Sequence, residues 1–410
     1  MNGTGDDGWS EGRLLDVTQP AAPIGYGIVQ PGPYVRNGVP VIAIRDLDNL
    51  SDRTTHRSSP SIEAAYRRSR VTAGDLLISV KGTTGRIGIV PTGFEGNISR
   101  DVARVRLTDA HDPEFWFQLL RSFAAQQILQ LAAVGSTRQE LSIGTLKMLR
   151  FRFPDRPEQE RIAEALLDSD RLTRALELMI AKKRAIKQGM MQQLLTGKIR
   201  LPGFTEVWEE LHAGDIGQFK GGSGFPVRFQ GSKSGKFPFF KVSDMNNEGN
   251  ELFMSGAKNY ISESQRKQMG AVLMPKQAIV FAKVGAAVFL ERKRILTESS
   301  CIDNNMAALI LDDTRADVRF IYHMLTNFPM GSLVATGALP SLNGRQLRSI
   351  PVSLPTDLDE QREIAAVLGD ADAEISALRN RLGKAQAVKT GMVQELLTGR
   401  SHLAIKNAAS

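Results

Sequence analysis

The sequence has very little of what builds disulfides, metal centres or membrane spans. Its 410 residues include one cysteine, Cys301, which excludes an internal disulfide. The five histidines are scattered and form no cluster with zinc-ligand spacing, so no metal site is predicted. No run approaches the roughly 20 apolar residues that a membrane helix needs, and the start, MNGTGDDGWSEG, lacks the features of a signal peptide. We therefore expect a cytoplasmic protein without a membrane segment.

Catalytic motifs are also missing. An amino-methyltransferase needs a glycine-rich cofactor loop and an Asn/Asp-Pro-Pro-aromatic motif that holds the flipped base. The glycine clusters at 82–88 and 221–225 are predicted to be turns between strands, with a cofactor loop as the less favoured alternative. No Walker motif follows a glycine loop, and Asp155 and Asp357 lack the Glu-x-Lys partner of a nuclease motif. We predict that the chain alone catalyses nothing and holds no cofactor.

Positive charge is present in modest excess. The net charge is +8 and the isoelectric point is near 9.6, and the excess is spread over both halves of the chain rather than gathered in a tail. The 42% hydrophobic content is enough for more than one core. This balance mildly favours a polyanionic partner that contacts two folded domains.

The most informative feature is an internal repeat. Residues 158–198 and 360–400 align without gaps at an offset of 202, with 19 identical pairs among 41. Weaker matches precede each copy in the same order: 39–47 with 237–245, 75–82 with 278–285, 102–107 with 306–311, and 141–154 with 342–355. The whole unit is therefore duplicated, and two similar domains suit a target that also has two parts, such as duplex DNA with two half-sites.

The repeat divides the chain into four predicted segments: globular 1–156, helical 157–200, globular 201–356 and helical 357–405. Short β-branched and aromatic runs in the globular segments alternate with turn residues, and helical stretches are expected at 113–132 and 318–334. The strands and helices do not alternate regularly. The predicted fold class is therefore α+β, with two mixed domains in tandem pseudo-repeat.

The two helical segments carry clear start and stop signals. Asp155 and Asp357 stand at N-cap positions, each three residues before a glutamate, and Gly197 and Gly399 stand in a shared LLTG where the helices end. Apolar residues recur between them at spacings of three and four: Ile162, Leu166, Leu172, Leu176, Met179, Ile186, Met190, Leu194, and Ile364, Leu368, Ile375, Leu378, Leu382, Val388, Met392, Leu396. A stripe this long needs a partner helix. We expect the two helices to pair as an antiparallel coiled coil, with an intermolecular coiled coil as the alternative.

Glycines also stand at matching positions inside both helices. Gly189 and Gly391 each cost about 1 kcal/mol relative to alanine. They predict a close approach or a bend of the helices, and the alternative is inherited tolerance without a role.

The duplicated unit, with helical repeats that begin near EQ and end in LLTG, resembles the specificity (S) subunit of type I restriction-modification systems. The resemblance covers essentially the whole chain. It implies that 1–156 and 201–356 are target recognition domains, each reading one half of an asymmetric bipartite DNA site, and that the helices hold them apart. It further implies two methyltransferase (modification) subunits as partners, which bind S-adenosylmethionine for adenine methylation, and restriction subunits that can join to cut unmethylated DNA.

Each recognition domain needs cations for phosphates and amide, hydroxyl or guanidinium groups for base edges. The candidates lie in or beside glycine-containing loops, with most weight on 135–142 and 337–343. They are Lys81, Arg86, Arg100, Arg138 and Gln139 in the first domain, and Lys241, Lys283, Asn304, Ser341, Asn343 and Arg345 in the second. For each of them an ordinary surface role stays open, and the basic cluster at 181–187 is predicted to be a solvated helix face or a partner surface.

Two function classes remain open at this point. The first is a non-catalytic DNA reader within a restriction-modification enzyme. The second is an orphan or free-standing DNA-binding or scaffold protein of the same architecture, which would bind DNA without partners and leave genomic methylation unchanged. An enzyme that acts alone ranks third.

Overall fold

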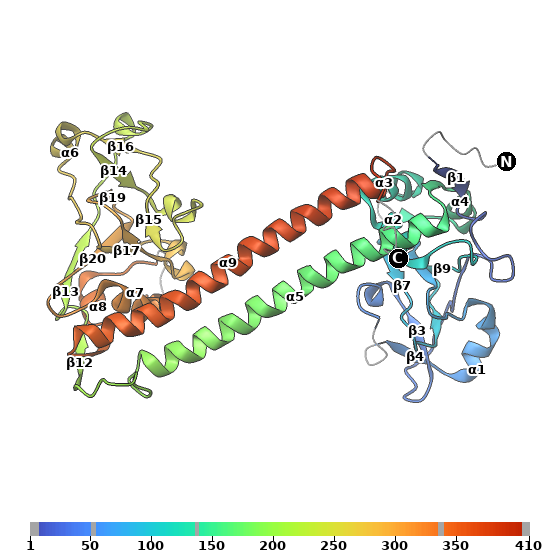
Figure 1. Ribbon diagram of the computed structural model, residues 1–410, viewed down its shortest axis with the longest axis horizontal. Helices are drawn as coiled ribbons and strands as arrows, with labels where there is room; N and C mark the ends of the chain where they lie inside the picture. The colour runs from blue at the N-terminus through green and yellow to red at the C-terminus, as the bar shows by residue number, and fades with distance from the viewer. Residues whose placement is uncertain (1–7, 51–54, 136–138, 335–339, 404–410) are drawn as a thin grey trace, which may run out of the picture. The chain divides into compact units, whose positions relative to one another are not determined.

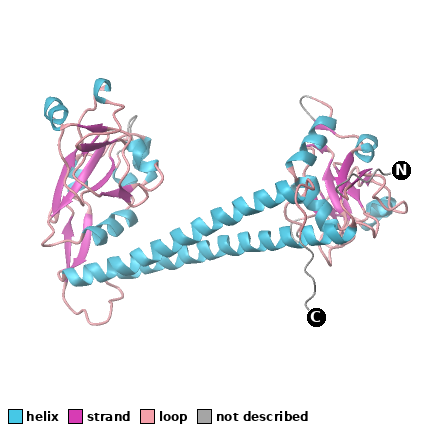
Figure 2. Cartoon of the chain, turned by 45° about the horizontal axis from the view of Figure 1, so that its top comes forward, coloured by secondary structure: helices cyan, strands magenta, loops and turns pink. Residues whose placement is uncertain are grey.

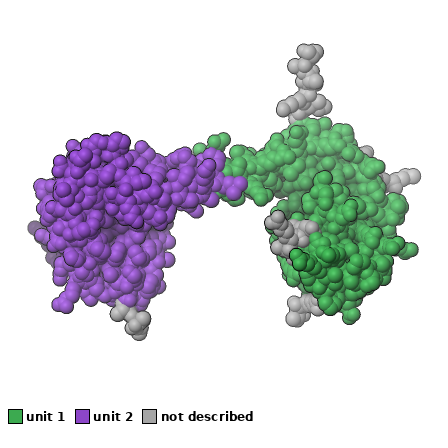
Figure 3. All heavy atoms as spheres, turned by 90° about the horizontal axis from the view of Figure 1, so that it is seen from below, with its two compact units in different colours: residues 1–177, 380–410 green, residues 178–379 purple. Residues whose placement is uncertain are grey.

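The computed structural model describes residues 8–50, 55–135, 139–334 and 340–403. They divide into two compact units, residues 1–177 with 380–410 and residues 178–379, coloured separately in Figure 3. Each unit combines strands with helices (Figure 2), which confirms the α+β class. Both boundaries between the units fall inside the long helices α5 (Arg156–Leu194) and α9 (Leu358–Leu396). Each unit therefore holds one globular domain, the start of the helix that follows it, and the end of the other helix (Figure 1).

Unit 1 is built around a four-stranded antiparallel sheet in the order β2-β9-β5-β7. A three-stranded sheet, β4-β3-β8, and the pairs β1-β11 and β10-β6 complete its strands. The bounds are β1 (Ser10–Arg13), β2 (Gly25–Tyr26), β3 (Val39–Ile42), β4 (His56–Ser58), β5 (Leu76–Ser79), β6 (Lys81–Gly82), β7 (Ile87–Ile89), β8 (Asn97–Ile98), β9 (Val102–Val105), β10 (Gln139–Glu140) and β11 (Arg150–Phe153). The helices before α5 are η1 (Ile44–Asp46), α1 (Pro60–Glu63), η2 (Ala64–Ser69), α2 (Pro113–Arg121), α3 (Phe123–Ala132) and α4 (Ile143–Met148).

Unit 2 repeats this plan with a five-stranded sheet, β13-β20-β17-β18-β15, a three-stranded sheet, β16-β14-β19, and the pair β12-β21. Its strands are β12 (Trp208–His212), β13 (Gly217–Gly221), β14 (Phe237–Phe240), β15 (Phe253–Met254), β16 (Tyr260–Ile261), β17 (Ile279–Ala282), β18 (Lys293–Leu296), β19 (Cys301–Ile302), β20 (Met306–Leu311) and β21 (Pro351–Pro355). Its helices before α9 are η3 (Val227–Phe229), η4 (Val242–Asn246), α6 (Glu263–Met269), η5 (Ala286–Leu290), α7 (Val318–Asn327), η6 (Met330–Leu333) and α8 (Gly344–Arg348). No helix among the described residues is long and apolar enough to cross a membrane.

Two expected helices are shorter than predicted. The stretch 113–132 is broken at Ser122, which has extended backbone angles and caps α3 by accepting a hydrogen bond from Ala125 N. The stretch 318–334 is broken at Phe328, because the proline that follows it disfavours helical angles in the residue before it. In each case a local capping or proline preference overrides the apolar periodicity.

Each unit by itself confirms that the two long helices run antiparallel. In unit 1, Asp170 of α5 forms an ion pair with Lys389 of α9. In unit 2 the lysine lies on α5 and the aspartate on α9, and Lys187 Nζ lies 2.5 Å from Asp372 Oδ1. The two pairs are equivalent under the repeat, since Asp170 aligns with Asp372 and Lys187 aligns with Lys389. The alternative of a purely intermolecular coiled coil is thus wrong for these described helices.

The predicted apolar seam is only partly correct. Four of the predicted residues in each helix are buried, namely Ile162, Leu166, Leu176, Leu194 and Ile364, Leu368, Ile375, Leu396. In contrast, Leu172, Met179, Ile186 and Val388 are exposed, while Ile180 and Met191 are buried outside the predicted seam. An α-helix has 3.6 residues per turn, so a seam with a strict seven-residue period drifts around a straight helix by about 20° per heptad. The predicted seam thus turns away from the partner helix along its length. Many of the buried positions lie near the helix ends, because the globular domains cover them there.

The repeated EQ motif fastens each long helix to its own domain. The side chain of Gln159, fully buried, donates to Pro154 O at 2.8 Å and accepts from Asp112 N at 2.9 Å. Gln361 makes the equivalent bonds to Pro355 O at 2.8 Å and from Asp317 N at 2.7 Å. Asp112 and Asp317 in turn cap helices α2 and α7. Each glutamine therefore locks the start of a long helix to the domain that precedes it.

The glutamates of the motif contact the segment that follows the other long helix. Glu360, fully buried, accepts two hydrogen bonds of 2.6 Å from the Arg200 guanidinium, just beyond α5. Glu158 accepts a 3.4 Å hydrogen bond from Leu403 N and lies 3.9 Å from the His402 ring, just beyond α9. Arg200 and His402 are themselves related by the repeat.

The predicted aspartate N-caps of the long helices are present. Asp155 Oδ1 accepts a hydrogen bond from Glu158 N, and Asp357 Oδ1 accepts one from Asp359 N.

The glycines of the helices separate into two kinds. Gly197 and Gly399 have φ values of 66° and 74°, as the predicted helix stops require. A Cβ built on Gly189 or Gly391 meets nothing within 4 Å, so the predicted close approach at these two positions is wrong.

Candidate nucleic-acid interface

The end of the central strand β5 meets two loops in unit 1. Val80 N donates to Asp101 O at 2.8 Å, and Leu141 N donates to Val80 O at 2.8 Å. These bonds bring together residues 80–82, 99–101 and 139–141, which we call the strand-end rim of unit 1. The rim contains three of the five residues predicted for this domain, which are Lys81, Arg100 and Gln139.

Lys81 and Gln139 lie on paired strands at this rim. Lys81 stands opposite Glu140, and its Nζ lies 3.0 Å from the Glu140 carboxylate. Gln139 stands opposite Gly82 and is exposed, and its Oε1 accepts a 3.1 Å hydrogen bond from Thr84. Within the described residues the amide nitrogen of Gln139 has no hydrogen-bond acceptor, so it can donate to an acceptor on a ligand.

Arg100 lies beside a pocket of about 550 Å³ that is lined by residues 28–32, by Arg45 and by His56. The Arg100 side chain is 48% exposed and lies 3.8 Å from Asp101. His56 Nε2 is buried without a hydrogen-bond partner among the described residues. The pocket therefore presents the guanidinium groups of Arg45 and Arg100, which suit acceptor atoms on base edges or phosphates.

The remaining two candidates of unit 1 differ from these. Arg86 lies at the far side of the turn 82–86, where it forms an ion pair with Asp48. Arg138 falls outside the described residues. Sequence reasoning missed Arg45 and His56, although Arg45 lies in the aligned segment 39–47, where its counterpart in the second copy is Ser243.

Unit 2 forms the same rim with the same backbone hydrogen bonds. Lys283 N donates to Asn305 O at 2.8 Å, and Leu342 N donates to Lys283 O at 2.9 Å. Residues 283–285, 303–305 and 340–342 make up the strand-end rim of unit 2, and it holds the predicted residues Lys283, Asn304 and Ser341. Asn304 and Ser341 are exposed and Lys283 is half-buried.

A close backbone approach shapes this rim. A Cβ on Gly222 would lie 1.9 Å from Asp303 O, and one on Gly221 would lie 2.9 Å from Lys283 Nζ. Only glycine fits at Gly222, so the GGSGF cluster that was predicted to be a turn serves as a close crossing next to the rim.

Lys241 lies next to this rim, because Asp303 N donates to the carbonyl oxygen of Phe240 at 2.9 Å. Its Nζ donates to Gln230 Oε1 at 2.5 Å and lies 5.5 Å from the centre of the Phe225 ring. Burial raises the pKa of Asp303, while Lys241 opposes that shift. Lys241 therefore has partners within the protein and is less free for DNA than Lys283.

Asn343 and Arg345 belong to the start of α8. Asn343 Oδ1 accepts hydrogen bonds of 3.0 Å from Arg345 N and Gln346 N, so this oxygen serves as a helix cap. Arg345 is exposed on the helix surface. The structure thus gives Asn343 a structural task that the sequence analysis did not foresee.

A family model described as "Type I restriction modification DNA specificity domain" matches residues 25–188 and again residues 205–386. The "Type I restriction enzyme EcoBI specificity subunit" of Escherichia coli is 26% identical over 204 residues. That match covers 47% of this chain and 42% of the relative, so it spans less than half of that protein.

Solved structures share the fold of the whole chain. The S subunit of a type I restriction-modification system from M. genitalium matches with a TM-score of 0.59 at 16% identity, covering 95% of this chain and 96% of that one. The HsdS subunit of Thermoanaerobacter tengcongensis matches with a TM-score of 0.50 at 17% identity, covering 96% and 97%. The two family matches, which span most of the sequence, show that the chain belongs to the type I restriction-modification DNA specificity family.

Proposed function

We propose that this chain is the non-catalytic DNA-reading subunit of a type I restriction-modification enzyme. In this proposal each globular domain reads one half of a bipartite duplex site through its strand-end rim. The observation that carries the proposal is that the two rims share their backbone hydrogen bonds but differ in their side chains. Arg100 in one rim corresponds to Asn304 in the other, and Val80 corresponds to Lys283.

Different side chains on one framework suit the reading of two different sequences. Arginine pairs with two acceptors of guanine in the major groove, whereas asparagine pairs with adenine. Lysine neutralises phosphates without reading a sequence. We therefore expect an asymmetric bipartite site rather than a palindrome.

Partners and cofactor follow from the same proposal. Two modification subunits would supply the S-adenosylmethionine and the methyl transfer, and restriction subunits would join them for cleavage. The sequence of this chain has no cofactor loop or base-holding motif of its own, which is consistent with the division of labour that we propose.

The test is modification-sensitive long-read sequencing of the source genome with the gene intact, deleted and restored. Loss of adenine methylation at one asymmetric two-part motif on deletion, with its return on restoration, would support the proposal. Persistence of every methylated motif in the deletion strain, together with duplex binding by the purified chain, would instead favour a free-standing DNA-binding protein.

A further inference from the structure

Unit 1 contains a cluster of five arginines away from its strand-end rim. Two hollows of about 420 and 450 Å³ share the lining residues Pro23, Arg67, Arg68 and Arg104. The second hollow is also lined by Arg70 and Arg106. We call the two hollows together the arginine pocket.

Two of the five guanidinium groups are neutralised inside the protein. Arg70 Nε and Nη2 donate to the Glu63 carboxylate at 2.7 and 2.6 Å. Arg106 Nε and Nη2 donate to the Asp75 carboxylate, both at 2.7 Å. Glu63 and Asp75 are both 1% exposed, so these ion pairs are fixed parts of the domain.

Arg104 forms no ion pair within the described residues, although the charge of the nearby Asp75 partly opposes the effect of burial on the Arg104 pKa. It is 4% exposed, and its two Nη atoms donate to the carbonyl oxygens of Arg70 and Pro23 at 2.9 and 3.3 Å. Its Nε is buried without a partner among the described residues. A buried cation satisfied only by carbonyl groups carries a desolvation penalty that an anion would offset.

Arg67 and Arg68 contribute further positive charge at the mouth of the pocket. Both are exposed, and neither has an ion pair within the described part of the chain. Three of the five arginines thus lack a paired carboxylate.

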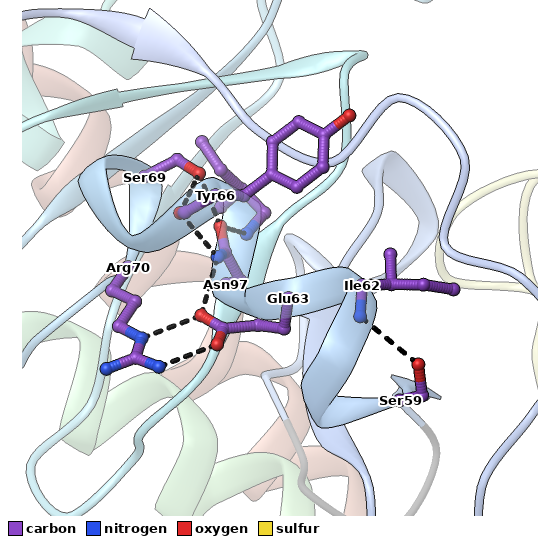
Figure 4. A network of polar contacts seen from close by, with 8 residues as sticks. Ser59, Ile62, Glu63, Tyr66, Ser69, Arg70 and Asn97 are labelled. Carbon is purple, nitrogen blue, oxygen red and sulfur yellow. Dashed lines mark hydrogen bonds and ion pairs between the residues drawn. The ribbon is translucent and has the colours of Figure 1, made fainter.

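The backbone that carries Arg67 and Arg68 is held in place by buried polar contacts (Figure 4). Asn97 Nδ2 donates to Glu63 Oε1 at 3.0 Å and to Tyr66 O at 2.9 Å, and Ser69 Oγ donates to Asn97 Oδ1 at 2.6 Å. Glu63, Tyr66 and Ser69 flank the two arginines on α1 and η2. The guanidinium groups therefore extend from a preorganised turn, which reduces the entropy lost when they bind a ligand.

The second domain has no counterpart of this pocket at the matching strand. Arg104 of β9 and Arg106 just beyond it align with Ala308 and Ile310 of β20, and Ala308 is buried in an apolar cluster. The arginines are therefore not needed by the shared fold, and they point to a task of the first domain alone.

We propose that Arg67, Arg68 and Arg104 bind a backbone phosphate of duplex DNA beside the bases that the rim of unit 1 faces. Residues 23–26 line the arginine pocket, and residues 28–32 line the pocket beside Arg100, so the two sites follow one another along the same chain segment. The four residue steps from Arg100 to Arg104 span at most about 14 Å, which corresponds to roughly four base pairs of axial rise. Guanidinium groups bind phosphate oxygens through paired hydrogen bonds. This inference rests on the proposed function of DNA reading.

The test compares the full chain with the double variant R67A/R68A in binding to labelled duplexes, with and without the methylated motif. Binding is measured between about 50 and 200 mM salt, since each lost phosphate contact lowers the salt slope by about 0.9. We expect the slope to fall by about one unit at most and the affinity to fall by the same factor for both duplexes, because phosphate contacts carry no sequence information. The matched control is R171A/R174A, which removes equal charge from exposed positions of α5 in the same unit.

The outcomes separate this inference from the proposed function. If R67A/R68A binds both duplexes with the wild-type affinity and slope, the phosphate site is refuted while DNA reading stands. If the wild-type chain binds no duplex even when it is assembled with its modification subunits, both are refuted. The charge reversal R68E, with circular dichroism as a check of folding, should weaken binding further. Stabilisation of the wild type but not of R67A/R68A by inorganic phosphate, without any change in duplex binding, would overturn the assignment to the DNA backbone.

Discussion

The indole of Trp9 lies directly against Gly399, the glycine that follows α9. A Cβ on Gly399 would come within 2.9 Å of the ring, and the residue has a φ of 74°. Trp208 covers Gly197 in the same way, with a Cβ distance of 3.1 Å and a φ of 66°. Each globular domain thus covers the end of one long helix, the first domain that of α9 and the second that of α5.

Gly399→Ala is expected to destabilise unit 1. The new methyl group must displace the Trp9 ring, and a left-handed conformation costs an L-residue about 1–2 kcal/mol. We expect a loss of about 1–3 kcal/mol in the free energy of unfolding, measured by urea denaturation with tryptophan fluorescence. Gly391→Ala is the matched control, because a Cβ there meets nothing within 4 Å and alanine favours the helix by about 1 kcal/mol. Equal effects of the two substitutions would contradict the role of the Trp9 contact.

The ion pair between Lys187 and Asp372 is expected to stabilise the antiparallel pairing in unit 2. Lys187 is 16% exposed and Asp372 is 39% exposed, so solvent screens the pair only in part. A double-mutant cycle with alanine should give a coupling of about 0.5–1 kcal/mol. The more exposed pair of Lys183 and Glu374 in the same helices should give less. A coupling near zero for the first pair would show that the apolar contacts alone set the pairing.

His323 should make unit 2 sensitive to acid. Burial lowers its pKa from 6.5 to about 4, and Lys187 adds to this effect, while Asp372 opposes it. The remaining charged groups that act on the ring are Arg319 and Asp317. Because the folded state holds the neutral ring, stability is complete above pH 6.5 and is lost as the pH falls from about 6.5 towards 4. The loss from this group is at most about 3 kcal/mol.

The variant His323→Gln tests this dependence, because glutamine is the residue that the first copy of the repeat has at this position. Gln118 occupies the equivalent position in unit 1, where its side chain donates to Asp170 at 3.3 Å. The variant should have a flatter stability profile between pH 6.5 and 4, measured by thermal unfolding. His212→Gln is the control, because His212 is exposed on β12. An unchanged profile for His323→Gln would assign the acid sensitivity to other groups.

The framework of the fold could be predicted from the sequence because its signals are local or repeated. The caps and stop glycines of the long helices lie where they were predicted, and each aligned segment carries a matching strand in both units. The identical residues of the repeat, such as Gln159 and Gln361, turned out to make equivalent contacts. Identity in both copies thus marked these two glutamines as parts of the framework.

The candidate site was harder to predict because it depends on contacts between distant parts of the chain. Arg67 and Arg104 line one pocket although 37 positions separate them in the sequence. A periodic pattern cannot reveal such a meeting. The usable signal was the difference between aligned copies, since arginines at 104 and 106 stand where the second copy has Ala308 and Ile310.

The two rims should control different halves of the target. Asn304→Ala removes an exposed amide from the rim of unit 2, so we expect relaxed specificity at one base of one half-site, worth about 1–3 kcal/mol per paired contact. Arg100→Ala should relax the other half-site and leave the first intact. Each variant serves as the control for the other, and the readout is the methylated motif in genomes that carry one variant gene. Relaxation of both halves by either variant would mean that the rims do not read separately, because a residue confined to one domain cannot discriminate bases in both.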